Sequence, residues 1–275
     1  MYMKVEPAWS KASDAWDRWG WSLQRQYGAA TEKMLDMASV TTGCHIIDIA
    51  AGPGYQTIQA AKKVGPSGTV LGVDLSAEML AIARRNIDAQ RLTNVAFKQA
   101  DAATLEGVRL GFDGAICRLS LMIFSDPLAA LKSAHTVLKP GGKLSVMVFS
   151  SPARNTFLSQ PERIIRKRLG LSPPSPDQPG LFKLAKPETL ERLFCDAQFR
   201  DFQCEFVEAP QLLSSSKEHV LFLQQASRAL IELMNDAGEH TQRSIWREIE
   251  EAASAFDEQN GFVGPCEVIL AAAAK

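Results

Sequence analysis

Cysteine is scarce and scattered in this sequence of 275 residues. The five cysteines include no CxxC pair, which argues against a disulfide framework and favours reduced thiols in the cytosol. No apolar run approaches the ~18 residues of a membrane-spanning helix, and the first residues lack the apolar core of a signal peptide. We therefore expect a cytoplasmic protein that makes no membrane contact.

An excess of charge of either sign is missing as well. The sequence has 30 Lys and Arg against 31 Asp and Glu, a net charge of −1, whereas nucleic-acid-binding domains normally carry a basic excess. His135 belongs to the buried stripe of a predicted helix, and His45, His219 and His240 are too scattered to form a metal site with Cys or Asp partners. We therefore expect neither nucleic acid nor metal as a partner. A small-molecule substrate remains, and the sequence leaves monomer and homodimer open.

Between residues 44 and 150, short β-rich runs alternate with helical segments. The runs are CHIIDI, TVLGVD, NVAFKQ, FDGAIC and KLSVMVF. Continuous apolar strands that alternate with amphipathic helices predict a parallel sheet covered on both faces. Ser76 is expected to cap the helix after the second run, and Asp126 with Pro127 to begin the helix after the fourth.

Three acidic residues lie at the ends of the first three predicted strands. Asp74 follows Asp48 by 26 residues, and Asp101 follows Asp74 by 27. Each acid taken alone could be a helix cap, and a glycine turn alone could serve only geometry. Because the carboxyl ends of parallel strands meet at one edge of the sheet, all three acids can face one crevice, which is where α/β sheets bind ligands.

The turn after the first strand, AAGPG, indicates what this edge could bind. Gly52 and Gly54 allow the backbone to approach a ligand closely. Asp48 could order that turn or reach a cationic group, and it would repel a pyrophosphate. Asp74 is placed like the acid that takes both hydroxyls of a ribose, and Asp101 could accept from an adenine amino group. An adenosine with a cationic amino-acid tail, S-adenosyl-L-methionine, satisfies all of these features.

Five segments together resemble the class I S-adenosylmethionine-dependent methyltransferases, and most of all their ubiquinone/menaquinone-biosynthesis-like branch. They are IIDIAAGPG, VLGVDLSAEML, VAFKQADAATL, FDGAIC and LKPGGKLSVMVF, and the resemblance covers roughly residues 8–150, 187–207 and 261–273. It implies an α/β, Rossmann-like fold with a seven-stranded, mostly parallel sheet whose last strand runs antiparallel. Ala50 stands where the family usually has glycine, which is tolerable if its φ is not positive. AQF at 197–199 departs from the usual Ala-Gly-Phe.

The resemblance also implies roles for individual residues. The turn after the first strand would border the methionine part, Asp74 would hold the ribose, and Leu75 would pack on adenine. Asp101 and the Ala102 backbone would read the adenine edge, while the residues after the fourth strand would line the reacting end. No catalytic residue can be named. The full predicted cofactor-binding set is Asp48, Ala50, Gly52, Gly54, Asp74, Leu75, Met79, Asp101, Ala102, Arg118 and Leu119.

We predict a single methyltransferase domain over residues 1–275. An N-terminal helical cap (1–40), with a helix over 8–38, precedes the cofactor-binding core (41–150). A helical cover insertion (151–260) includes the sixth strand and helices at 216–235 and 241–258. The final strand (261–275) completes the sheet.

Four of the five tryptophans fall in the first 21 residues. Trp9, Trp16 and Trp19 share a helical face, which could dock the helix on the domain or form a lid over the ligands. The candidate substrate or lid residues are Trp16, Trp19, Met122 and Phe124. The basic run 163–168 is either a solvated helix face or a clamp for an acidic acceptor.

The sequence therefore predicts methyl transfer from S-adenosyl-L-methionine to a small, partly apolar molecule at an N, O or C atom. A nicotinamide-dependent oxidoreductase is one alternative, since AAGPGYQT followed by Asp74 imitates a dinucleotide fingerprint. Thr57 at the third glycine position argues against it. A non-catalytic subunit that binds the same donor is the other alternative.

Overall fold

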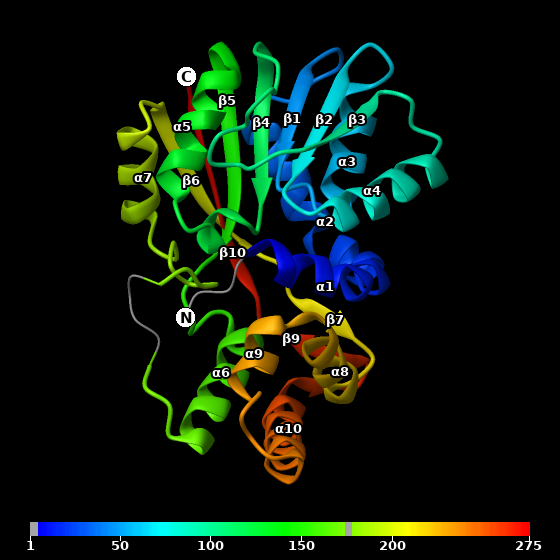
Figure 1. The fold of residues 1–275 in the computed structure, drawn as a ribbon, viewed down its shortest axis with the longest axis vertical. Coiled ribbons are helices and arrows are strands. Elements are labelled where there is room, and N and C mark those ends of the chain that lie inside the picture. Colours follow the sequence, from blue (N-terminus) through cyan, green and yellow to red (C-terminus); the bar gives the residue numbers. More distant parts are fainter. Residues whose placement is uncertain (1–4, 174–177) are drawn as a thin grey trace.

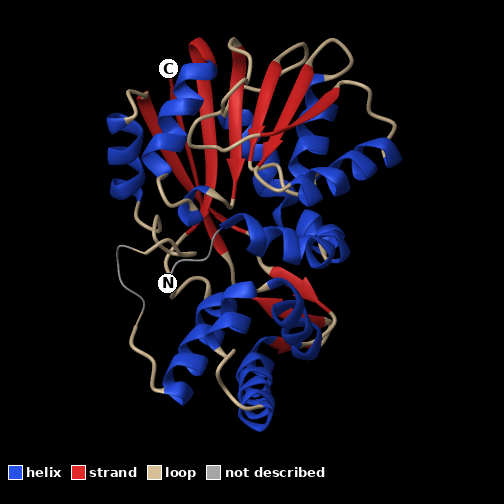
Figure 2. Ribbon diagram, viewed as in Figure 1, coloured by secondary structure: helices blue, strands red, loops and turns tan. Residues whose placement is uncertain are grey.

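A twisted seven-stranded sheet forms the larger part of the molecule (Figures 1 and 2). The computed structural model describes residues 5–173 and 178–275. The strand order is β3-β2-β1-β4-β5-β10-β6; β1 to β5 are parallel, and β10 runs antiparallel to both of its neighbours. The predicted fold class is confirmed. The strands are β1 His45–Ile49, β2 Thr69–Asp74, β3 Val95–Gln99, β4 Phe112–Arg118, β5 Leu138–Phe149, β6 Arg200–Glu208 and β10 Glu267–Ala274.

Helices cover both faces of this sheet, as the apolar runs require. On one face α2 packs against α3 and against β5 and β10, and α3 packs against α4; on the other face α5 packs against α7. Both predicted caps are confirmed: Ser76 accepts from the Met79 N–H at 3.2 Å, and Asp126 from the Ala129 N–H at 2.8 Å. These helices are α2 Gly20–Met37, α3 Tyr55–Val64, α4 Ala77–Ala89, α5 Pro127–Val137 and α7 Pro187–Asp196.

The predicted N-terminal helix over 8–38 is wrong in one respect, because it consists of two helices. The first helix, α1 Val5–Arg18, ends before Trp19, and α2 starts at Gly20. Gly20 lies so close to Tyr55 of α3 that a Cβ there would meet the phenol oxygen at 1.8 Å. The chain turns at this point, and α1 lies between the sheet and the helices that follow residue 155 and do not flank the sheet (Figure 1).

The segment after β5 builds a second layer around a small sheet that the sequence did not predict. Strands β7, β9 and β8 form this sheet in that order. The predicted helix 216–235 breaks at Ser227, and the predicted helix 241–258 ends at Ala253. The predicted final strand is interrupted at Pro265, which has no N–H for a sheet ladder. The elements are α6 Thr156–Leu169, β7 Gln211–Leu213, α8 Ser216–Ala226, α9 Arg228–Leu233, α10 Glu239–Ala253, η2 Ser254–Phe256, β8 Asp257–Glu258 and β9 Gly261–Gly264.

The carboxyl ends of β1 to β5 point toward α1 and this second layer (Figure 1). Any ligand at that edge would therefore lie between the sheet and the α-helical cover. Within residues 5–173 and 178–275, no helix is long and apolar enough to cross a membrane.

Candidate functional site

The turn after β1 is built from left-handed backbone. Gly52 has φ 53° and Gly54 has φ 85°, conformations that glycine adopts without strain. Ala50 has φ 58°, so the condition under which alanine was tolerable at this position, a φ that is not positive, is not met. The Ala51 N–H donates to the Val73 carbonyl at 2.9 Å and holds the turn against β2. A Cβ at Gly52 would meet no atom within 4 Å, so the backbone is accessible on that side.

Asp48 lies beneath this turn and is fully buried. The Thr57 hydroxyl donates to one carboxylate oxygen at 2.5 Å, and the Gln56 amide donates to the other at 3.3 Å. Burial raises the pKa of Asp48 to about 7, against the hydrogen bonds and the nearby Arg118, which lower it. These contacts fasten the start of α3 to β1.

Asp74 connects the turn to the end of β2. One of its carboxylate oxygens accepts from the Gly52 N–H at 2.8 Å, and the other accepts from the Ser76 N–H at 2.9 Å. The side chain is half-buried, and burial raises its pKa above the ordinary value. A carboxylate offers about four lone-pair positions, so the Gly52 and Ser76 bonds leave capacity for a ligand. Leu75 is half-buried beside it, and Met79 is buried in α4.

Asp101 lies at the rim of the edge and is exposed. Its carboxylate accepts from the Ala103 N–H at 2.8 Å, a local turn contact. The neighbouring Ala102 carbonyl accepts from the Ser133 hydroxyl of α5, and the Ala100 N–H donates to the Asp74 carbonyl at 3.0 Å. The exit of β3 is thereby tied to the exit of β2.

Helix α1 closes over the start of α4, beside Asp74. The Ser10 hydroxyl donates to Glu78 and lies 3.1 Å from the Ser76 hydroxyl, and Asp17 pairs with Arg85 at 2.6 Å. These contacts come from the middle and the C-terminal end of α1. They hold α1 against α4, from the Ser76 cap to Arg85 in the second half of that helix.

The contacts of Trp16 and Trp19 are docking contacts, and the lid role stays a prediction. The Trp19 indole N–H donates to Gln225 of α8 at 3.0 Å, and its ring meets Phe222 edge-on. Trp19 therefore docks the N-terminal helices on the cover. Trp16 is half-buried and packs on the core, while the side chain of Trp9 lies outside the described part of the structure.

The end of β4 brings a cation to the same edge. Arg118 is half-buried, and its Nη1 donates to the Thr31 hydroxyl of α2 at 3.1 Å. Burial lowers the pKa of Arg118 to about 10, against the opposing effects of Asp48 and Tyr27. Leu119 follows in a left-handed conformation, φ 55°, with its N–H donating to Met147 at 2.8 Å.

The two remaining lid candidates lie just beyond, around the 3₁₀ turn η1 Leu121–Ile123. Met122 is buried and Phe124 is half-buried, and both pack on the core. The backbone carbonyl of Met122 also accepts a hydrogen bond from the Gly180 N–H at 3.3 Å. The structure thus brings the acids, the glycine turn, Arg118 and α1 together at one edge.

Sequence reasoning missed three polar residues of this edge. Gln56 and Thr57 hold Asp48, and their position directly after the glycine turn, at the start of an apolar helix, was an available signal. Thr31 holds Arg118 from α2, and nothing in its surroundings in the sequence marks it.

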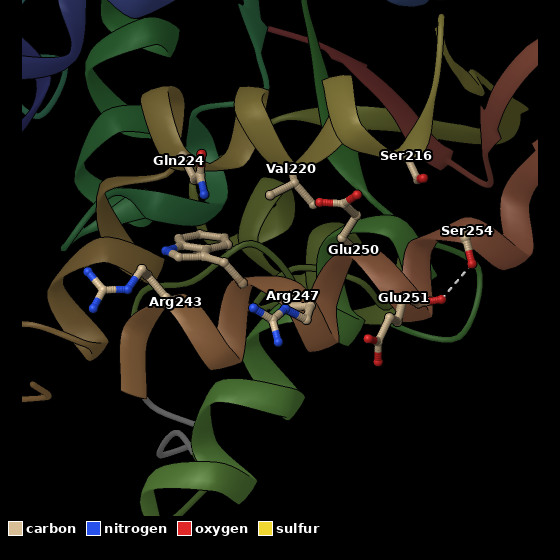
Figure 3. Close-up of a pocket in the computed structure, with 9 residues that line it drawn as sticks. Ser216, Val220, Gln224, Arg243, Arg247, Glu250, Glu251 and Ser254 are labelled. Carbon is tan, nitrogen blue, oxygen red and sulfur yellow. Dashed lines mark hydrogen bonds between the residues drawn. The ribbon is translucent and has the colours of Figure 1, made fainter. Parts of the chain in front are cut away.

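Two cavities in the described part of the chain lie away from this edge. One of about 560 Å³ opens between α8 and α10, where Figure 3 shows Gln224 and Val220 above Arg243, Arg247 and Glu250. The other, about 570 Å³, lies between the junction of α1 with α2 and the start of the cover. In the basic run, Arg166 pairs with Glu162 and Arg168 with Glu248, as a solvated helix face would. Among the described residues, no three His, Cys, Asp or Glu side chains gather as metal ligands do.

Comparison with known proteins gives one family match, which is described as a methyltransferase domain and covers residues 41–167. The ubiquinone/menaquinone biosynthesis C-methyltransferase UbiE of Cellvibrio japonicus is 39% identical over 127 residues, which are 46% of this chain and 51% of that protein. The chain therefore spans about half the length of the curated relatives it matches.

Solved structures that resemble the chain share its fold at low identity. The YcgJ protein of Bacillus subtilis has a TM-score of 0.59 at 19% identity, over 90% of this chain and 98% of that one. Haemonchus contortus phosphoethanolamine N-methyltransferase 2, solved with S-adenosyl-L-methionine, has a TM-score of 0.56 at 19% identity, over 94% and 57%. The [4+2]-cyclase SpnF has a TM-score of 0.55 at 18% identity, over 98% and 97%.

Proposed function

Because its core, residues 41–167, belongs to the class I S-adenosylmethionine-dependent methyltransferase superfamily, we propose that this chain transfers a methyl group from S-adenosyl-L-methionine to a small, partly apolar molecule. The observation that carries the proposal is the half-buried Asp74 carboxylate, held by the Gly52 and Ser76 N–H groups at the carboxyl edge of the sheet.

The residues present fit such a donor. The acceptor capacity left on the Asp74 carboxylate suits the vicinal hydroxyls of a ribose. The Gly52 backbone has no neighbouring atom in the way of a ligand. Leu75 supplies an apolar surface for adenine, and Asp101 at the rim supplies an acceptor for an amino group. We propose that Ala50, Gly54, Met79, Ala102 and Leu119 contact the same donor.

The donor, when bound, supplies a methyl group already activated by the positive charge on its sulfur. The protein then has to orient the acceptor in line with that methyl group and to exclude water, and orientation can contribute up to ~7–11 kcal/mol. Helix α1 and the cover would exclude water. An amine acceptor needs no general base, and we name none.

An apolar acceptor would lie between the edge and the cover. Four apolar cover residues that suit such an acceptor, Phe157, Phe222, Leu230 and Met234, are buried in the core, whereas Leu221 is exposed. Their packing is therefore already satisfied, and the acceptor contacts are left to η1 and α1. We propose a cytoplasmic location from the five free cysteines, and a monomer or homodimer.

The two alternatives differ in what supports them. A dinucleotide would place its pyrophosphate above Asp48, a buried acid, and Thr57 replaces the third glycine of that fingerprint. A role without methyl transfer has one observation in its favour, since the cyclase SpnF has the same fold. Fold alone therefore does not decide the reaction.

Calorimetry separates these functions. Titration with S-adenosylhomocysteine, the demethylated donor, should give saturable binding, and NADH should give none; binding of NADH alone would overturn the proposal. Single-turnover assays with methyl-labelled donor and pools of small phenols, amines and quinols then test transfer. Donor binding without label transfer to any pool would favour the non-catalytic subunit.

A further inference from the structure

Arg118 is a half-buried cation for which the described residues supply no anionic partner. Its single direct hydrogen bond goes to the neutral Thr31 hydroxyl, and it takes part in none of the ion pairs of the described residues. A guanidinium has five N–H donors, so most of its capacity is unused. By contrast Arg85, Arg154, Arg166 and Arg168 each have a carboxylate partner.

Nearby groups do not neutralise this charge. Asp48 interacts electrostatically with Arg118 but lies outside ion-pair distance, and its own carboxylate is held by Thr57 and Gln56. With a pKa of about 7, Asp48 is only partly ionised near neutral pH. Tyr27, the other group that interacts with Arg118, has a pKa raised by burial and is therefore a neutral phenol.

The position of Arg118 makes this unpaired charge informative. Burying a cation without a counter-charge is unfavourable, and a surface position would have avoided that cost. Arg118 instead ends β4, next to β1, so it faces the edge where α/β sheets bind ligands. Thr31, on α2, accepts from one nitrogen of the Arg118 guanidinium. The other N–H groups of the guanidinium are left to bind a ligand, and their planar arrangement matches a planar oxyanion.

We propose that Arg118, positioned by Thr31, binds a carboxylate or similar planar oxyanion of a ligand at the carboxyl end of β4. This inference rests on the proposed function and deepens it. The oxyanion can come from two sources: an acidic acceptor molecule, or the amino-acid tail of the methyl donor. In the first case the substrate class is a small aromatic or aliphatic acid, and in the second Arg118 anchors the donor.

The test compares wild type with Arg118→Gln and Arg118→Lys. Arg109→Gln is the matched control, because Arg109 also donates to a threonine hydroxyl, that of Thr69 at 3.2 Å, but at the opposite ends of the strands. Calorimetry measures the affinity for two nucleosides. S-adenosylhomocysteine has the carboxylate of the amino-acid tail, and 5′-deoxy-5′-methylthioadenosine lacks the whole amino-acid tail. Benzoate and its neutral analogue benzamide are then titrated into free and nucleoside-loaded protein.

If the donor tail is the source of the oxyanion, Arg118→Gln should weaken the binding of S-adenosylhomocysteine by about tenfold to a hundredfold and leave the binding of methylthioadenosine unchanged. If the acceptor is the source, both nucleosides should bind unchanged, while benzoate but not benzamide binds wild type and is lost in Arg118→Gln. Arg118→Lys should recover part of either loss, since it keeps the charge without the fork. Arg109→Gln should change nothing.

Equal binding of all four compounds to wild type and both Arg118 variants would overturn the inference. The midpoint of thermal unfolding identifies a variant that does not fold. If Arg118→Gln does not fold, Arg118→Lys is compared with wild type, and equal affinities of these two proteins for the ligands would contradict the inference. If wild type binds no S-adenosylhomocysteine, the proposed function fails, and the benzoate titration of free protein still tests Arg118 on its own.

Discussion

Asp48→Asn should change how the stability of this protein depends on pH. Asp48 is fully buried, and burial raises its pKa from 3.8 to about 7. A group with a raised pKa contributes its stability fully below its unfolded pKa, and that stability is lost as pH rises through the folded pKa. The window therefore runs from about pH 4 to about pH 7, and the ionised form is the unfavourable one.

The magnitude follows from the same shift. A difference of about three pKa units corresponds to roughly 4 kcal/mol, at 1.36 kcal/mol per unit. Asparagine keeps an oxygen that can accept from the Thr57 hydroxyl and never ionises. Relative to wild type, the Asp48→Asn free energy of unfolding should therefore gain about 3 kcal/mol between pH 4.5 and pH 8.5, because part of the shift lies below pH 4.5, and most of this gain should be complete by pH 7 to 8.

Urea unfolding of both proteins across this range measures the difference directly. Titrations common to both proteins cancel when one curve is subtracted from the other. Thr57→Val is the control, since loss of its hydroxyl removes the largest contribution that lowers the Asp48 pKa and should move the midpoint of the difference curve upward. Parallel curves for wild type and Asp48→Asn would refute the assignment of this titration to Asp48.

Three further changes test the site and its supports. Asp74→Asn should weaken the binding of S-adenosylhomocysteine by about 10–150-fold in calorimetry, the change in affinity that corresponds to loss of a hydrogen bond to a charged group. An unchanged affinity would remove Asp74 from the site. His219 is buried between Gln211 and Phe157, and burial lowers its pKa to about 4. The stability that neutral His219 contributes, up to about 3 kcal/mol, is present above pH 6.5 and is lost as the pH falls toward 4. His219→Gln should therefore reduce the slope of the free energy of unfolding against pH between these values, and a slope equal to that of wild type would contradict this. Gly20→Ala should detach α1, increasing its proteolysis while the sheet stays folded, because the new Cβ would overlap Tyr55; protection equal to wild type would contradict the contact.

The elements that local patterns predict are those whose causes lie within a few residues. Ser76 and Asp126 cap the helices they precede, and the apolar runs form the parallel strands, because capping and alternation act over one or two turns. The breaks at Trp19 and Ser227 have no such local cause. Trp19 is fixed by Gln225, which lies 206 residues further along the chain.

The same distinction applies to the site. The acids and the glycine turn could be placed at one edge because right-handed connections between parallel strands leave little choice. The partners of their side chains could not, since Thr31 reaches Arg118 from a helix that precedes the sheet. For this reason the sequence alone left two roles open for Asp48, ordering the turn or reaching a cationic ligand group. Its place on β1 could be predicted, whereas its contact with Thr57 in the protein interior could not.

Backbone conformation at the edge adds a physical reason to regard it as functional. Ala50 and Leu119 both have left-handed φ, near 58° and 55°, which costs a non-glycine residue roughly 1–2 kcal/mol. They follow β1 and β4, neighbouring strands of the sheet, and the hydrogen bonds of Ala51 to Val73 and of Leu119 to Met147 hold the backbone in place. Strained residues persist where surrounding contacts determine them, and they cluster at sites that bind ligands. Asp48 and Arg118 come from the same two strands, so the strain and the incompletely neutralised charge coincide at one point of the sheet, between the turn after β1 and the end of β4.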